Sequence, residues 1–191
     1  MATAGAPIPA SAERDYDSHP VALWLNSHSK IVVAGALCAM TLDGGSSGEA
    51  AKSAVDAMLI SVAAAEALKA IVDQARPRDA GARDGFPSSH TAASFAFARG
   101  VAESDSGLGA AAYMFAGAVG WARVEGGYHT LEQVLGGALL GIVLANISIE
   151  SGGVVINSGE GSASALLSDR RGTGAETLPG TKSVVLWETQ W

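Results

Sequence analysis

The sequence is poor in charge and in cysteine. Only 16% of its 191 residues are charged, against about 25% in a typical soluble domain. The single cysteine, Cys38, excludes an internal disulfide framework and a cysteine-based structural zinc site. The net charge of −7 argues against a nucleic-acid partner, which would require clustered positive charge. Four histidines remain, so a histidine-based site stays open.

Apolar residues are abundant instead. They make up 48% of the chain, and the mean hydropathy is +0.25. These values fit one domain with a substantial core, but they do not decide whether its surroundings are water or lipid. The uncharged stretches at residues 106–122 and 134–149 fall short of the roughly 20 residues that a membrane span needs.

The order of apolar and polar segments predicts an all-α bundle of five to six helices; its membrane-embedded or membrane-associated location is implied by the family resemblance given below. Residues 21–25 and 31–42 form an apolar region broken by polar residues 26–30, and a loop is predicted over 43–48. The other predicted helices cover residues 50–75, ending near Arg76 because of Pro77, residues 91–99 after a start at 87–90, and residues 108–122 and 129–149.

Three regions are expected along the chain. Residues 1–20 form a disordered lead, residues 21–150 the helical domain, and residues 151–191 a Gly/Ser-rich tail. The lead lacks the basic start and apolar run of a secretory signal. Nothing in the tail indicates a protein partner.

Two short polar segments beside the helices could bind an anion. Lys69 and Arg76 are seven residues apart, which on a continuous helix places both on one face, about 10 Å apart along the axis. Ser88 and Ser89 precede a helix whose free backbone N–H groups can bind an anion, with His90 placed to exchange a proton. The plainer alternatives are a solvated basic edge and an ordinary N-cap.

A third polar segment joins two predicted helices. Gly126 and Gly127 allow the backbone to turn so that Arg123 and His129 converge. An ordinary polar loop is the alternative. Each segment alone is weak, and their combined order and spacing is much more specific.

Together the segments resemble the signature of the phosphatidic acid phosphatase type 2/haloperoxidase superfamily. That signature reads K-x6-R-P, then P-S-G-H, then S-R-x5-H-x3-D. The residues that match it are Lys69, Arg76, Pro77, Pro87, Ser88, His90, Arg123 and His129. Ser89 stands in the place of the glycine, Ala122 in that of the serine and Gln133 in that of the aspartate. The Pro-Ser-Ser-His and His-Thr-x-x-Gln patterns look most like the branch of dolichyl-diphosphatase-like enzymes and plastid lipid phosphate phosphatases.

The resemblance implies hydrolysis through a phosphohistidine. His129 would attack phosphorus, and His90 would protonate the leaving group and then activate water. Gln133 would orient His129 by accepting its ring N–H, without offsetting its positive charge. The phosphoryl oxygens would be bound by Lys69, Arg76, Ser88, Ser89 and Arg123.

The resemblance also implies a substrate and a location. It implies a lipid phosphate or polyprenyl diphosphate, a membrane, and no metal or cofactor. Three alternatives stay open: a soluble acid-phosphatase-like enzyme on small phosphate esters, a vanadate-dependent haloperoxidase with His129 as the vanadate ligand, and a non-catalytic member.

Overall fold

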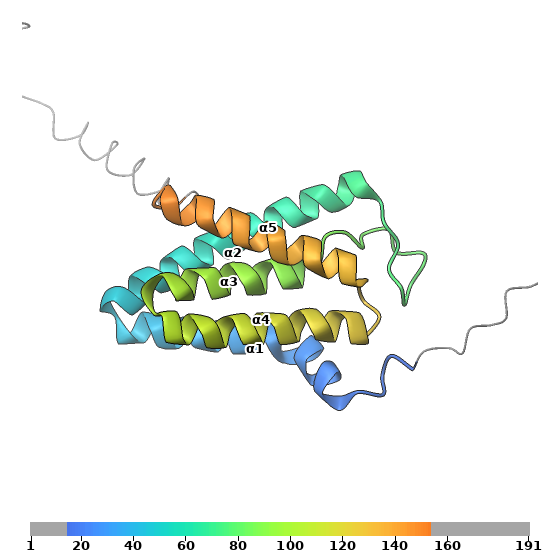
Figure 1. The fold of residues 1–191 in the computed structure, drawn as a ribbon, viewed down its shortest axis with the longest axis horizontal. Coiled ribbons are helices and arrows are strands. Elements are labelled where there is room, and N and C mark those ends of the chain that lie inside the picture. The colour runs from blue at the N-terminus through green and yellow to red at the C-terminus, as the bar shows by residue number, and fades with distance from the viewer. Residues whose placement is uncertain (1–14, 154–191) are drawn as a thin grey trace, which may run out of the picture. The chain divides into compact units, whose positions relative to one another are not determined.

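The computed structural model describes residues 15–153, except for the side chain of residue 46. It contains five helices: α1 (Pro20–Asp43), α2 (Gly45–Val72), α3 (Ser89–Ser104), α4 (Ser106–Glu125) and α5 (Leu131–Glu150) (Figure 1). No strand occurs within residues 15–153, where one isolated bridge joins Gln74 to Asp84. The all-α prediction is therefore confirmed. The predictions for residues 1–14 and 154–191 lie outside the described residues.

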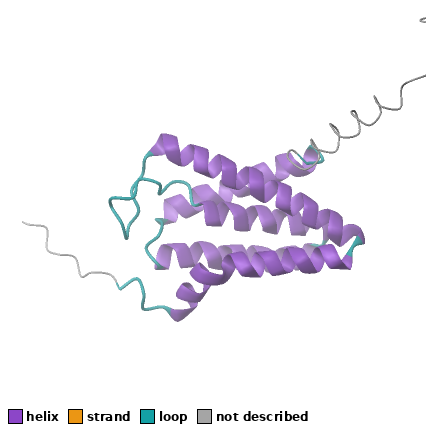
Figure 2. Cartoon of the chain, turned by 180° about the vertical axis from the view of Figure 1, so that it is seen from behind, coloured by secondary structure: helices purple, strands orange, loops and turns teal. Residues whose placement is uncertain are grey.

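Helix α3 is the central element of the bundle. It packs against α2, α4 and α5, and α1 packs against α2 and α4. Figure 1 shows α3 between α5 and α4, and Figure 2 gives the same arrangement from behind. A buried cluster that includes Val33, Ala54, Phe97 and Ala116 joins the first four helices. The α2–α3 and α4–α5 loops meet at one end, where the Arg78 N–H donates to the carbonyl of Gly127 over 2.8 Å.

Glycines set the contact between α3 and α5. A Cβ added to Gly137 would collide with the carbonyl oxygen of Ser88, and one added to Gly141 with that of Ala92. The two backbones therefore touch, as the small residues of this region allow. This contact fixes the start of α3 against the first turns of α5.

The first loop prediction is wrong. Helix α1 runs unbroken through the polar residues 26–30, and Gly44 alone separates it from α2, in place of a loop over residues 43–48. Gly44 has a φ of 73°, which a residue with a side chain rarely adopts. One glycine is therefore enough to reverse the chain.

The predicted end of the second helix is also wrong. Helix α2 ends at Val72, so Arg76 lies in the following loop and does not share a helix face with Lys69. The cause is Asp73, which adopts a left-handed conformation with a φ of 48°. Arg83 holds it there with hydrogen bonds of 3.0 and 3.1 Å to its carboxylate and 2.7 Å to its carbonyl.

Within residues 15–153, two helices are long and apolar enough to cross a membrane: α1 and α5, with mean hydropathies of 1.3 and 1.6. Length and composition alone support this, and a core helix or a signal sequence passes the same test. Most of each apolar window is not buried, since the buried share is 22% in α1 and 39% in α5. The exposed apolar residues of α5 recur every four positions, as Leu131, Leu135, Leu139, Val143 and Ile147.

Candidate active site

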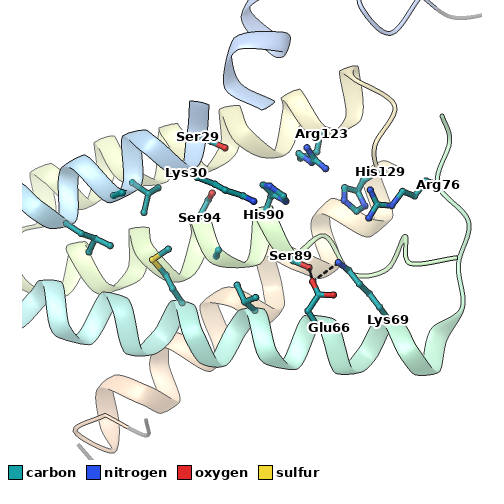
Figure 3. Close-up of a pocket in the computed structure, with 16 residues that line it drawn as sticks. Ser29, Lys30, Glu66, Lys69, Arg76, Ser89, His90, Ser94, Arg123 and His129 are labelled. Atoms are coloured by element: carbon teal, nitrogen blue, oxygen red, sulfur yellow. Dashed lines mark hydrogen bonds and ion pairs between the residues drawn. The ribbon is translucent and has the colours of Figure 1, made fainter. Parts of the chain in front are cut away.

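A cavity of about 370 Å³ lies between α1, α2 and α3 and extends to the two loops at the end of the bundle. Figure 3 shows its cations and histidines gathered around one part of it. They are the cations Lys30, Lys69, Arg76 and Arg123 and the histidines His90 and His129. The apolar lining comes from Val33, Ala34 and Leu37 of α1, Met58 and Val62 of α2, and Ala93 of α3. The cavity thus combines a cationic part with an apolar part.

The structure brings most of the predicted site residues to this cavity. Its lining includes Lys69, Arg76, Ser89, His90, Arg123 and His129. Ser88 and Gln133 are buried behind it and are not among the lining residues. Ser88 is the N-cap of α3, and its hydroxyl oxygen accepts hydrogen bonds from the backbone and side chain of Thr91 at 3.5 and 2.9 Å. Its contacts are therefore those of a helix cap.

His129 lies in the turn before α5, because Thr130 is the N-cap of that helix. The turn starts at Arg123, whose carbonyl accepts hydrogen bonds from the N–H groups of Tyr128 and His129 at 3.0 and 3.1 Å. Gly127 makes the turn feasible with a φ of 68°. The turn thereby brings Arg123 and His129 to the same cavity. This agrees with the convergence that the sequence predicts from Gly126 and Gly127.

The ring of His129 has a defined tautomer. Its Nδ1 lies 2.8 Å from the carbonyl oxygen of Gly85 and 3.3 Å from Oε1 of Gln133. Both neighbours accept, so Nδ1 carries the proton and Nε2 carries the lone pair. Burial lowers the pKa of His129 to about 4, and the charge of Arg123 acts in the same direction. At neutral pH the ring is therefore uncharged, with Nε2 available as a nucleophile.

The orientation of the Gln133 amide follows from its partners. Its Nε2 donates to the carbonyl of Ala75 at 2.9 Å and to Oε1 of Gln74 at 3.2 Å. Its Oε1 accepts the N–H of Thr130 at 3.1 Å as well as Nδ1–H of His129. An aspartate or glutamate could not donate to the Ala75 carbonyl. Gln133 therefore joins the α2–α3 loop to the ring of His129.

Gly85 occupies a position with no space for a side chain. A Cβ there would lie 2.5 Å from Nε2 of Gln133 and 2.6 Å from the carbonyl oxygen of Ala75. The Gly85 N–H also donates to the carbonyl of Gln74 over 2.8 Å. This close approach places the Gly85 carbonyl where His129 needs it.

Arg123 is the most enclosed cation of the cavity. It is 6% exposed, and burial lowers its pKa to about 10. One guanidinium nitrogen, Nη1, donates to Oδ1 of Asn26 at 3.2 Å, and the group lies 4.2 Å from the centre of the Tyr128 ring. Its Nε is buried without a hydrogen-bond partner among the described residues. An unpartnered cationic donor beside a cavity is suited to an anionic ligand.

The other two predicted cations are held by carboxylates. Arg76 makes two hydrogen bonds to Asp84, at 2.8 and 2.6 Å. Nζ of Lys69 lies 2.8 Å from Oε1 of Glu66, which also accepts a 2.6 Å hydrogen bond from the Ser89 hydroxyl. These bonds from Lys69 and then Ser89 lower the pKa of Glu66. The carboxylate thus positions both donors at the cavity.

His90 stands in the first turn of α3 and lines the same cavity. Burial lowers its pKa to about 4, and the nearby charges of Arg123 and Lys30 add to the effect. Bound phosphate would oppose this shift, because a neighbouring anion stabilises the imidazolium. A proton on His90 is thus favoured when an anion occupies the cavity.

Sequence patterns missed Asn26, Lys30, Glu66 and Gly85. The first two belong to the polar break at residues 26–30, which interrupts an otherwise apolar stretch. That break was the available signal, because a polar cluster within an apolar helix often marks a functional face. No cluster of three or more His, Cys, Asp or Glu that could hold a metal ion occurs within residues 15–153.

Comparison with known families agrees with this geometry. Residues 50–153 match the model of the PAP2 superfamily. The chain therefore belongs to the PAP2 superfamily, and membership supports an activity of the phosphatase type. Comparison with curated proteins and with solved structures gives no match.

Proposed function

We propose that this chain is a metal-independent phosphatase that hydrolyses a lipid phosphate or diphosphate through a phosphohistidine on His129. The observation that carries the proposal is the proton held on Nδ1 of His129 by Gly85 and Gln133. It leaves Nε2 unprotonated in a cavity lined by three cations of the family signature, Lys69, Arg76 and Arg123. A nucleophile beside converging cations suits phosphoryl transfer.

The reaction takes place in two steps. Nε2 of His129 forms a bond to phosphorus while the bond from phosphorus to the leaving oxygen breaks, and His90 supplies a proton to that oxygen where it needs one. The oxygen of a water molecule then bonds to phosphorus while His90 accepts the water's proton. The bond from phosphorus to Nε2 breaks, its electron pair returns to His129, and inorganic phosphate leaves. Lys69, Arg76 and Arg123 neutralise the charge on the three equatorial oxygens. Ser89 contributes hydrogen bonding at the start of α3.

The apolar part of the cavity supports a substrate with an aliphatic chain. Val33, Leu37 and Val62 offer no hydrogen bonds to a sugar or peptide, and they can cover a hydrocarbon. The exposed apolar residues of α5 support a membrane location for the enzyme. Membrane fractionation tests this location. The protein is expected to be released from membranes only by detergent. Its release by alkaline carbonate would contradict the membrane location and favour a soluble phosphatase that acts on small esters.

The activity is tested by phosphate release from dodecyl monophosphate and dodecyl diphosphate in detergent micelles. The wild-type protein is expected to release phosphate from at least one of them, and His129→Ala to release none above background. A matched control is His28→Ala, since His28 is exposed on α1 and its ring stacks on Trp24. If the wild-type protein releases phosphate from neither compound, the enzyme proposal fails and the chain is a non-catalytic member of the family. Bromide oxidation with peroxide and added vanadate would identify a haloperoxidase instead.

A further inference from the structure

A fourth cation lines the cavity from a helix that the family match does not cover. Lys30 lies on α1, and the match begins at residue 50. Among residues 15–153 no carboxylate forms an ion pair with it, whereas Lys69 and Arg76 are both paired. Figure 3 shows its side chain reaching from α1 toward His90. Lys30 is therefore a free cation directed at the general acid/base of the proposed reaction.

The cations are distributed unevenly between the two histidines. Arg123 lines the cavity together with both histidines, and its charge lowers the pKa of His90 and of His129. Lys30 and Lys69 are among the charges that act on His90, and Arg76 is among those that act on His129. Figure 3 agrees, with His90 between Lys30 and the group formed by His129 and Arg76. Lys30 thus lies on the His90 side of the cavity.

That side is where the leaving group departs. In the proposed function, on which this inference rests, His129 attacks and His90 serves the leaving oxygen. We propose that Lys30 binds the second phosphoryl group of a diphosphate substrate and makes the site selective for diphosphates over monophosphates. The N–P bond forms on the terminal phosphorus, and the bond from that phosphorus to the bridging oxygen breaks. The electron pair stays on the departing alkyl phosphate, whose charge Lys30 offsets.

The lining of α1 follows the order of such a substrate. Lys30, Val33 and Leu37 are spaced three and seven residues apart, so they share one helix face over about 10 Å. A lipid diphosphate would match this order. Its terminal phosphoryl would lie among the other cations, its second phosphoryl would contact Lys30, and its hydrocarbon chain would pack against Val33 and Leu37. A monophosphate would place its alkyl chain against the ammonium group of Lys30. This order favours a diphosphate.

The acid/base properties of His90 agree with the same substrate. A phosphate monoester has a second pKa of about 6, so it departs with little need for a proton, whereas an alcohol must be protonated. Burial and neighbouring cations lower the pKa of His90 to about 4. Its ring is therefore mostly unprotonated near neutral pH and seldom has a proton to give to a leaving group. A cation that stabilises an anionic leaving group compensates for this.

The position of Lys30 within α1 adds a second argument. It lies in the middle of a helix that is apolar enough to span a membrane. A cation at such a position is costly unless it faces a polar or water-filled interior, and it usually serves function there. Lys30 is an exposed residue that lines the solvent-accessible cavity, which fits that expectation.

The test compares Lys30→Met with the wild-type protein on dodecyl diphosphate and dodecyl monophosphate, which share one chain. Loss of a charge-assisted contact is expected to lower kcat/KM on the diphosphate by about 10- to 100-fold. The value on the monophosphate is expected to change by less than about threefold, within the range of an uncharged contact. Lys30→Arg is expected to restore most of the diphosphate activity. Lys52→Met is the control, since Lys52 is an exposed lysine of α2 that binds Glu49.

A binding measurement makes the test independent of turnover. Methylenediphosphonate is expected to raise the melting temperature of the wild-type protein more than methylphosphonate does, and Lys30→Met is expected to remove that difference. Equal losses on both substrates, or no loss on the diphosphate, would overturn the inference while the proposed function stands. A wild-type protein inactive on both substrates would overturn the proposed function and this inference with it.

Discussion

Oε1 of Gln133 lies 3.3 Å from Nδ1 of His129, and the Nε2 of the same amide donates to the carbonyl of Ala75 at 2.9 Å. His129 and Gln133 have the two largest fully buried side chains within the described residues. Gln133 stands where the family signature has an aspartate, yet it accepts the ring N–H as an aspartate would. This contact places no negative charge beside the ring.

Replacing Gln133 by glutamate tests this relationship. A carboxylate beside Nδ1–H stabilises the imidazolium and raises the pKa of His129 from about 4. The acid limb of kcat/KM, which reports ionisation in the free enzyme, is therefore expected to move to higher pH. The melting temperature should fall as well, because the new carboxylate cannot donate to the Ala75 carbonyl. Glu132→Gln, an exposed neighbour, should change neither; an unmoved acid limb in Gln133→Glu would contradict the account.

Thermal stability is expected to decrease on acidification because the ring of His129 is buried. The pKa of His129 in the folded state is about 4, below its ordinary value of 6.5, so the unfolded chain takes up protons first. The free energy of unfolding that depends on an uncharged His129 is fully present above pH 6.5 and is lost as the pH falls toward 4. His129→Asn does not titrate, so its melting temperature should fall less over that interval than the wild-type value. Parallel losses in the two proteins would contradict a buried neutral ring.

Asn26 is expected to act as a positioning residue for Arg123. Its amide donates to the carbonyl of Ala122 at 2.9 Å and accepts from Arg123 at 3.2 Å, which joins α1 to α4. Asn26→Ala should cost about 1–3 kcal/mol of stability, because both bonded groups are left without this partner. It should also reduce the rise in melting temperature caused by millimolar phosphate.

The control for this prediction is Asn146→Ala. Asn146 accepts a 2.6 Å hydrogen bond from Arg99, between α3 and α5 and away from the cavity lining. It should lower stability by a similar amount and leave the phosphate-induced rise unchanged. A phosphate-induced rise that survives in Asn26→Ala would assign Asn26 a structural role alone.

Gly85→Ala is expected to damage the site far more than Gly117→Ala does. Its Cβ would lie 2.5 Å from Nε2 of Gln133, so either the amide or the loop must move. Activity should fall at least about tenfold, as expected where about 1–3 kcal/mol of strain acts on a reacting geometry. Gly117→Ala on α4 meets nothing within 4 Å and should retain activity and gain up to about 1 kcal/mol. Full activity in Gly85→Ala would contradict the role of the Gly85 carbonyl.

The sequence could predict the residues of the cationic part because they lie in short segments with a specific spacing. Arg123 and His129 converge through one turn, and His90 follows directly from a proline–serine helix start. The spacing of Lys69 and Arg76 suggested a shared helix face, and this was wrong, since Arg83 contacts Asp73 and ends α2 early. That contact is tertiary, so no local pattern contains it.

The contribution of α1 could not be predicted for the same reason. Asn26 and Lys30 form a polar break in an apolar stretch, and only the packing of α1 against α2 and α4 shows which side that break faces. Ser88 has a role that the signature did not indicate, because its hydroxyl caps α3 and accepts from Thr91. The anion contact suggested by its place in the signature stays a prediction. The fold class and the presence of both histidines at one site could thus be predicted. The residues that surround the histidines through tertiary packing, such as Asn26 and Lys30, could not.

The central claim is the covalent intermediate on His129, and trapping it is the most direct test. The protein is mixed with dodecyl diphosphate carrying a labelled terminal phosphoryl, quenched in alkali and digested. The account predicts acid-labile, alkali-stable label on the peptide that contains His129, more of it in His90→Ala because water is no longer activated, and none in His129→Ala. Phosphate release by His129→Ala at the wild-type rate, or turnover with no labelled protein in His90→Ala, would contradict it.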